Sequence, residues 1–156
     1  MNLALPPSRV PDPADAPPLR WGILGTGWIA AKFVDALRRH TRQQVVACGS
    51  RTRERADAFA ARWGIDHAWD SYEHLVADPT VDAVYVASPH SEHRDHALLA
   101  IRAGKHVLIE KAFTRNASEA REVVAAARDA RGAALEAMWT RFLPRHDVVR
   151  RLLEDG

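Results

Sequence analysis

The sequence predicts an α/β fold in which helices cover both faces of a doubly wound parallel sheet, giving three layers. Two observations support this prediction. From Arg20 onward, short apolar runs alternate with segments of helical periodicity. A glycine-rich turn directly follows the first apolar run and opens a helical segment. Alternation of this kind implies parallel strands that are joined by right-handed crossovers.

The strands are predicted from apolar runs rich in Val, Ile, Leu and Ala, a composition typical of strands that are buried on both faces. In chain order these runs are residues 21–24, 45–48, 83–87, 106–109 and 134–138. A shorter run at 67–69 predicts a weaker sixth strand.

The helices between them are predicted from apolar stripes at helical spacing. The stripes are Ile29, Phe33 and Leu37 on one helix, and Ala120, Val123, Val124 and Ala127 on another. Asn116 followed by Glu119 resembles a capping box and predicts the start of the second helix. Gly104 and Gly132 stand where helices should end.

The first predicted strand runs into Gly25-Thr26-Gly27-Trp28-Ile29-Ala30, a G-x-G-x-x-A turn. The first glycine permits a tight turn, the second lets a pyrophosphate approach the backbone, and Ala30 lets the helix pack close to the sheet. The free N–H groups of the helix N terminus favour the phosphates. An ordinary glycine turn is the alternative. The strand–turn–helix context favours a dinucleotide-binding Rossmann domain, with Thr26, Trp28 and Ile29 beside the cofactor.

The end of the second predicted strand bears on the choice between NADP and NAD. An NAD site usually has an acidic residue there for the ribose 2′-hydroxyl. This chain has Ser50 and Arg51 instead, with Arg53 and Arg55 close behind. Arginine suits a 2′-phosphate, so we expect NADP(H) rather than NAD(H). The alternative is that these arginines form a solvated helix start.

Composition excludes several classes of protein. The chain has 156 residues and a formal net charge of +2, too small an excess to indicate nucleic-acid binding. Its one cysteine, Cys48, falls in a predicted buried strand and cannot form an internal disulfide. No apolar run approaches the ~20 residues that cross a bilayer, and we find no signal peptide. We therefore expect a cytoplasmic protein that binds neither membranes nor nucleic acid.

Three histidines, His90, His93 and His96, raise the question of a metal site. Positions six apart lie on different sides of a helix, and neither cysteine nor carboxylate completes a ligand set, so we expect no metal. His90 and His93 are expected to line the cofactor cleft or to cap a helix.

Three further segments make a family recognisable. They are residues 87–93 (ASPHSEH), 104–112 (GKHVLIEKA) and 136–144 (EAMWTRFLP). Together with the glycine turn, they resemble the Gfo/Idh/MocA oxidoreductases, named for glucose–fructose oxidoreductase, inositol dehydrogenase and rhizopine catabolism. The last segment resembles the branch that contains dimeric dihydrodiol dehydrogenases and NADP-dependent xylose dehydrogenases. The resemblance covers the chain from Arg20 to Gly156.

The resemblance implies a two-domain enzyme that transfers hydride between NADP(H) and a small carbohydrate, polyol or vicinal diol. The chain then corresponds to the cofactor-binding half, without the family's C-terminal α/β domain, and the whole enzyme is expected to form homo-oligomers. The alternative is a dinucleotide-binding module without catalysis, or an inactive gene fragment. Three regions follow: a Pro-rich tail over 1–19 that we expect to be disordered or extended, the Rossmann domain over 20–142, and a linking helix over 143–156.

The resemblance also assigns roles to residues. Lys111 follows a strand at the edge where ligands bind. Its spacing alone favours a surface lysine, whereas the family uses this lysine in catalysis. Burial and a nearby cationic ring would lower its pKa and make it a better proton shuttle. The family's usual Glu-Lys-Pro is Glu110-Lys111-Ala112 here, which leaves the backbone after the lysine freer.

Further positions follow from the same resemblance. Glu110 is either a simple strand-end carboxylate or a residue that holds the lysine or contacts the nicotinamide ribose. The loop residues expected to contact the cofactor are Ser88, Pro89, His90 and His93, and Lys111 is expected to contact it as well. Trp139 and Arg141 are tentative substrate residues, and core packing is the alternative for Trp139.

Overall fold

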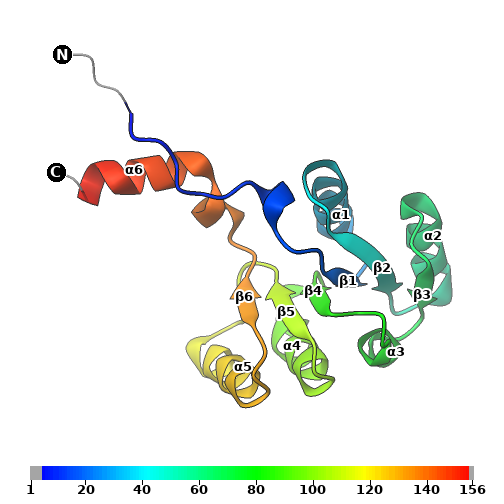
Figure 1. The fold of residues 1–156 in the computed structure, drawn as a ribbon. Helices are drawn as coiled ribbons and strands as arrows, with labels where there is room; N and C mark the ends of the chain where they lie inside the picture. Colours follow the sequence, from blue (N-terminus) through cyan, green and yellow to red (C-terminus); the bar gives the residue numbers. More distant parts are fainter. Residues whose placement is uncertain (1–4, 155–156) are drawn as a thin grey trace.

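The computed structural model describes residues 5–154 and contains one six-stranded parallel sheet. The strand order is β3-β2-β1-β4-β5-β6 (Figure 1). The strands are β1 (Arg20–Leu24), β2 (Gln44–Gly49), β3 (His67–Trp69), β4 (Ala83–Val86), β5 (His106–Ile109) and β6 (Ala134–Glu136). This order confirms the predicted doubly wound Rossmann sheet, including its short sixth strand.

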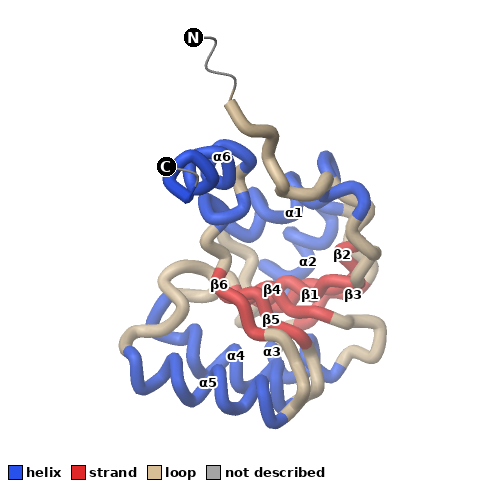
Figure 2. Tube along the Cα trace, turned by 60° about the vertical axis from the view of Figure 1, so that its left-hand side comes forward, coloured by secondary structure: helices blue, strands red, loops and turns tan. Residues whose placement is uncertain are grey.

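Helices cover both faces of this sheet, so the predicted three layers are confirmed (Figure 2). One face carries α1 (Trp28–His40) and α2 (Arg53–Trp63). The other carries α3 (Tyr72–Ala77), α4 (His93–Arg102) and α5 (Ala117–Asp129). The short 3-10 helices are η1 (Pro13–Asp15), η2 (His90–Glu92) and η3 (Trp139–Phe142), and α6 (Pro144–Glu154) follows the last of them.

The core has two halves, one on each side of the sheet. Ile23 packs toward α1 and α2, where Val34 and Phe59 are buried. Leu24, the next residue of β1, belongs to the opposite half with Leu75. Successive residues of a strand point to opposite faces. A strand in the middle of the sheet must therefore be apolar throughout, as the short apolar runs indicated.

Some details differ from the sequence predictions. The strands predicted over 83–87 and 134–138 end at Val86 and Glu136. On α1 the fully buried residues are Ala30 and Val34, whereas the predicted Phe33 is only partly buried. Val124 of α5 is exposed. A helix touches a sheet along a narrow line, so residues at the margin of an apolar stripe stay half in solvent.

The start of α5 follows the prediction. Asn116 is its N-cap, and its side-chain oxygen accepts a hydrogen bond from the Glu119 backbone N–H at 3.0 Å. Glu119 accepts from the backbone N–H of Arg115 at 3.1 Å rather than from that of Asn116. The cap is therefore reciprocal but shifted by one residue compared with a standard capping box.

The N-terminal segment lies beside α6 (Figure 1). Residues 5–19 are extended apart from η1, which Asp12 caps by accepting from Ala14 N at 2.8 Å. Asp147 of α6 is buried and accepts from the backbone N–H of Arg9 at 2.7 Å and from its guanidinium at 3.0 Å. The proline count did not reveal these contacts, because they depend on a helix 138 residues away in sequence.

Candidate cofactor-binding site

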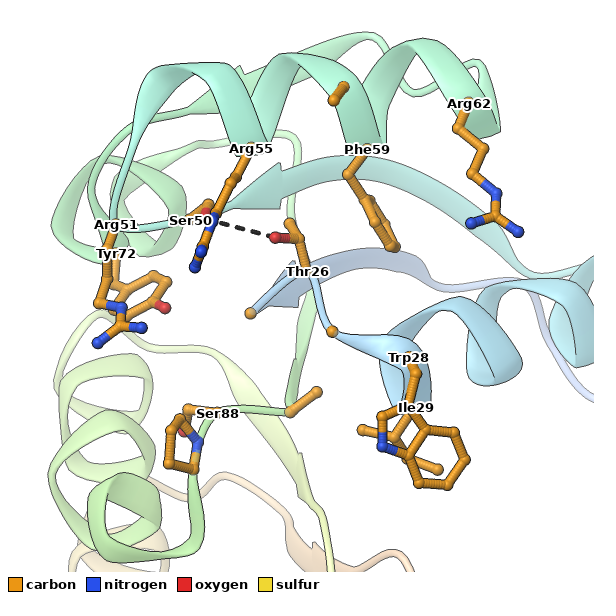
Figure 3. A pocket seen from close by; sticks show the side chains of 15 residues that line it. Thr26, Trp28, Ile29, Ser50, Arg51, Arg55, Phe59, Arg62, Tyr72 and Ser88 are labelled. Atoms are coloured by element: carbon orange, nitrogen blue, oxygen red, sulfur yellow. Dashed lines mark hydrogen bonds between the residues drawn. The ribbon is translucent and has the colours of Figure 1, made fainter.

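A cavity of about 690 Å³ opens at the carboxyl edge of the sheet. It lies where β1 and β4 are neighbours and their connections leave toward opposite ends of the sheet. Its walls come from the β1–α1 turn, α2, the first residue of α3 and the loop after β4 (Figure 3). Ligands of doubly wound folds bind at such a switch point.

Gly25 shapes the floor of this cavity. Its φ is +97°, and a Cβ added there would stand 2.9 Å from the carbonyl oxygen of Ala87. Its N–H donates to the Gly49 carbonyl at 3.0 Å, which ties the turn to β2. Any side chain at this position would meet both backbone strain and a neighbouring carbonyl.

Gly27 has a different environment. It is the N-cap of α1, and a Cβ added there would meet nothing within 4 Å. The first N–H groups of a helix have no acceptor within the helix, and the helix dipole makes this end positive. An anion such as pyrophosphate can therefore approach the backbone at Gly27, as the motif predicted.

One end of the cavity carries the residues that follow β2. Ser50 is buried and accepts a hydrogen bond from the Thr26 hydroxyl at 3.4 Å (Figure 3). Arg51 and Arg55 line the cavity. Arg53 instead turns away: its guanidinium donates to the Ala68 carbonyl at 2.7 Å.

Tyr72 lines the same end and was missed by the sequence reasoning. It is the first residue of α3, and its hydroxyl interacts electrostatically with the guanidinium groups of Arg51 and Arg55. Burial raises the pKa of Tyr72, and the two guanidinium groups act against that rise. The hydroxyl is therefore a neutral hydrogen-bond donor at pH 7. No local motif marks Tyr72, which reaches the site because β3 pairs beside β2.

A face of α2 also lines the cavity through Ala58, Phe59 and Arg62. With Arg55 these residues stand at positions i, i+3, i+4 and i+7, so one side of the helix faces the cavity (Figure 3). This spacing was visible in the sequence and could have identified the three residues.

The loop after β4 contributes Ser88 and Pro89 to the cavity, whereas His90 and His93 lie outside it. His93 is only 1% exposed, and its ring nitrogens lie 2.9 Å from the Ala112 carbonyl and 3.1 Å from the Ser88 carbonyl. It therefore contacts both the loop after β4 and the loop after β5. The ring of the exposed His90 lies 3.1 Å from the Thr114 carbonyl.

Glu110 and Lys111 follow β5 and do not form the cavity walls. The Glu110 carboxylate accepts hydrogen bonds from the Tyr85 hydroxyl and, at 3.0 Å, from the backbone N–H of Lys111. The Lys111 side chain is exposed, so the described residues do not supply the burial expected for it. The peptide bond between Lys111 and Ala112 is cis.

The two tentative substrate residues also lie apart from the cavity. Trp139 is 66% exposed in η3, which rules out a core position for it within this chain. Arg141, in the same short helix, is exposed as well.

Residues 5–154 lack two further features. They contain no group of three His, Cys, Asp or Glu side chains arranged to hold a metal ion. Within the same residues, none of the helices combines the length and the apolar character needed to span a membrane.

Comparisons with known proteins agree with this geometry. Residues 19–136 match the Gfo/Idh/MocA family model, described as an oxidoreductase family with an NAD-binding Rossmann fold. The trans-1,2-dihydrobenzene-1,2-diol dehydrogenase of Mus musculus is 42% identical over 140 residues, covering 88% of this chain and 42% of the relative. The D-xylose 1-dehydrogenase (NADP(+)) of Hypocrea jecorina is 43% identical over 152 residues, covering 88% and 38%.

A solved structure is similar as well. A 3-ketoreductase from Actinomadura kijaniata in complex with NADP superposes with a TM-score of 0.82 at 34% identity, over 90% of this chain and 45% of that one. The chain spans about two fifths of the length of the curated relatives that it matches.

Proposed function

Because this chain belongs to the Gfo/Idh/MocA oxidoreductase family and contains its NAD-binding Rossmann domain, we propose that it is the NADP(H)-binding part of an oxidoreductase. The proposed reaction transfers hydride to or from a sugar, a polyol or a vicinal diol. The preference for NADP(H) over NAD(H) rests on the side chains that follow β2. A buried Ser50 stands where an NAD site has a carboxylate, and Arg51 and Arg55 line the cavity beside it.

The cofactor fits the residues present in the cavity. The open surface at Gly27 and the N terminus of α1 would receive the pyrophosphate. Ser50, Arg51, Arg55 and Tyr72 would surround a 2′-phosphate. Arg53 forms ion pairs with Asp57 at 3.6 Å and Asp70 at 3.3 Å, whereas no ion pair within residues 5–154 involves Arg51 or Arg55. Their guanidinium groups are thus available to an anionic ligand.

Lys111 is the proposed proton-transfer residue. When bound, the nicotinamide ring supplies or accepts the hydride. In reduction the Lys111 ammonium would donate the proton to the substrate oxygen, and in oxidation the neutral amine would take the proton of the substrate hydroxyl. Glu110 supports this role because its carboxylate accepts from the Lys111 backbone N–H and thereby fixes where the side chain begins.

The substrate class rests on the relatives. Their names specify a dihydrobenzene diol and D-xylose, both of which carry neighbouring hydroxyl groups. We extend that class to the enzyme of which this chain forms the cofactor part. Its partners are then small carbohydrates or diols and, in the whole enzyme, further copies of itself.

Titration calorimetry with NADP and with NAD tests the cofactor assignment. We expect NADP to bind at least about tenfold more tightly, because two arginines face its additional phosphate. Arg51→Ala combined with Arg55→Ala should remove most of that difference. Arg53→Ala is the matched control and should leave the ratio unchanged. Equal dissociation constants for NADP and NAD would contradict the assignment.

Lys111→Ala tests the catalytic role in a form of the protein that turns over substrate. We expect kcat to fall at least about a hundredfold. Binding of NADP should remain within about threefold, because Lys111 lies outside the cavity. The exposed Lys32 of α1, replaced by alanine, is the control. Full kcat in Lys111→Ala would remove this residue from the mechanism.

A second function is a dinucleotide-binding module without catalysis. It is favoured by the positions of Lys111, Trp139 and Arg141, none of which lines the cavity. Turnover of NADP by this chain with a panel of aldoses and vicinal diols would contradict this second function.

A further inference from the structure

His96 lies behind the cavity and contacts two of its walls. Its Nδ1 atom is 2.8 Å from the Ser88 hydroxyl oxygen, and Ser88 belongs to the loop after β4. Its ring packs edge-on against the Tyr72 ring, with centroids 4.7 Å apart, and Tyr72 belongs to α3. Both contacted residues line the cavity, whereas His96 itself does not.

The position of His96 on α4 explains how it reaches Ser88. His93 and His96 stand three residues apart, so they lie on the same side of the helix. The His93 ring lies 3.1 Å from the Ser88 carbonyl, and the His96 ring contacts its hydroxyl. Ser88 is therefore held through its backbone by one histidine and through its side chain by the other.

The charge state of His96 suits this contact. Burial lowers the pKa of His96, and the carboxylates of Glu92, Asp95 and Glu73 act in the opposite direction, while His93 acts with burial. A neutral ring hydrogen-bonds the serine hydroxyl and packs on Tyr72 without placing a charge between them.

We propose that His96 is a positioning residue of the cofactor site, which fixes Ser88 and Tyr72 relative to each other so that the cavity is shaped before the dinucleotide binds. The inference rests on the proposed function, because the ligand is the dinucleotide assigned there. Preorganised walls bind more tightly, since less side-chain freedom is lost on association.

The test compares three variants by calorimetry with NADP and with adenosine 2′,5′-bisphosphate. His96→Leu removes the hydrogen bond, and we expect about 3- to 10-fold weaker binding of both ligands. His96→Asn places an amide near the position of Nδ1 and should restore affinity to within about twofold. His40→Leu, at the exposed end of α1, is the control and should bind like the unsubstituted chain.

Asn and Leu both remove the imidazole ring, but only Asn offers a group that can hydrogen-bond Ser88. Recovered affinity in His96→Asn therefore indicates positioning through that hydrogen bond, whereas a merely structural role would give equal losses in both variants. All affinities are measured well below the melting temperature of the least stable variant. If His96→Leu does not fold, His96→Phe keeps a ring beside Tyr72, lacks the hydrogen bond and gives the same comparison. Equal affinities for the Leu, Asn and unsubstituted forms, or equal losses in Leu and Asn, would overturn the inference. Failure of the unsubstituted chain to bind either ligand would overturn the proposed function itself.

Discussion

At the scale of single residues, the two glycine positions of the β1–α1 turn favour glycine for different reasons. Gly25 combines a positive φ with a carbonyl close to its missing Cβ, so its lack of a side chain is a requirement of the fold. Gly27 has an ordinary φ of −79° and open space around it, so the fold does not need a glycine there. In the proposed function the pyrophosphate lies in the space in front of Gly27, and this glycine would then be a requirement of binding.

The pair Gly25→Ala and Gly27→Ala separates these two requirements. We expect Gly25→Ala to lower the free energy of unfolding by about 2 kcal/mol or more, because an alanine at positive φ is strained and meets the Ala87 carbonyl. Gly27→Ala should cost less than about 1 kcal/mol yet weaken NADP binding at least about tenfold. Denaturant melts and calorimetry measure the two quantities. A Gly27→Ala chain that binds NADP normally would show that the phosphate lies elsewhere.

At the scale of elements, Asp78 joins β3 to the end of α3. It follows α3 directly, and its carboxylate accepts from the Thr80 backbone at 2.8 Å and from the Trp69 indole at 3.1 Å. The His67 ring lies 2.6 Å away. Burial alone would raise the pKa of Asp78, but hydrogen bonds from Thr80, His67 and Trp69 outweigh it and lower the pKa to about 2.

This lowered pKa makes the stability of the fold depend on pH. The folded-state pKa of Asp78 lies below the unfolded value, so its stabilisation is complete above the unfolded pKa and is lost as pH falls through the folded one. We expect Asp78→Asn to lower the free energy of unfolding by about 2 kcal/mol at pH 7. The difference should shrink between about pH 5 and pH 2.

Urea melts at several pH values measure this difference. Asp66→Asn, at an exposed position before β3, is the matched control and should change little at any pH. A difference between Asp78→Asn and the unsubstituted chain that stays constant down to pH 2 would contradict the assignment.

At the scale of the whole molecule, the surface of the C-terminal elements is rich in exposed apolar side chains. Leu135 of the edge strand β6 is 57% exposed, and Trp139 and Phe142 of η3 are 66% and 57% exposed. Val149, Leu152 and Leu153 of α6 are also exposed. Most exposed large apolar residues of the described chain therefore lie between 135 and 153. Larger apolar patches usually mark contact surfaces.

We expect this surface to make the chain associate with itself as concentration rises. Trp139→Ser combined with Phe142→Ser should shift the equilibrium toward the monomer, because it removes two of the largest exposed apolar side chains. Val124→Ser, at an exposed position on α5, is the control. Sedimentation velocity over a wide concentration range measures the association. A monomer at every concentration, or an equal shift in the control, would contradict this prediction.

Local patterns in the sequence were sufficient to predict the sheet and the phosphate-binding turn. Apolar periodicity and glycine conformations are local properties, and each depends on a few neighbouring residues. The strands near 21–24 and 106–109, the helix start at Asn116 and the roles of Gly25 and Gly27 could therefore be predicted. The alternation of elements and the handedness of their crossovers predicted a parallel, doubly wound sheet, and the structure supplied the order of its strands.

The packing of the folded chain determines which side chains face the cavity. Arg51 and Arg55 enter it while Arg53 turns to Ala68, and Tyr72 joins them because β3 lies beside β2. His93, expected to line the cleft or to cap a helix, is buried, and its ring lies against the carbonyls of Ser88 and Ala112, the second of them 19 residues away in sequence. The direction and burial of a side chain depend on what packs against it, and segments far apart in sequence supply that packing. The sequence shows which chemical groups are available to the site, and packing between segments far apart in sequence determines which of those groups face the ligand.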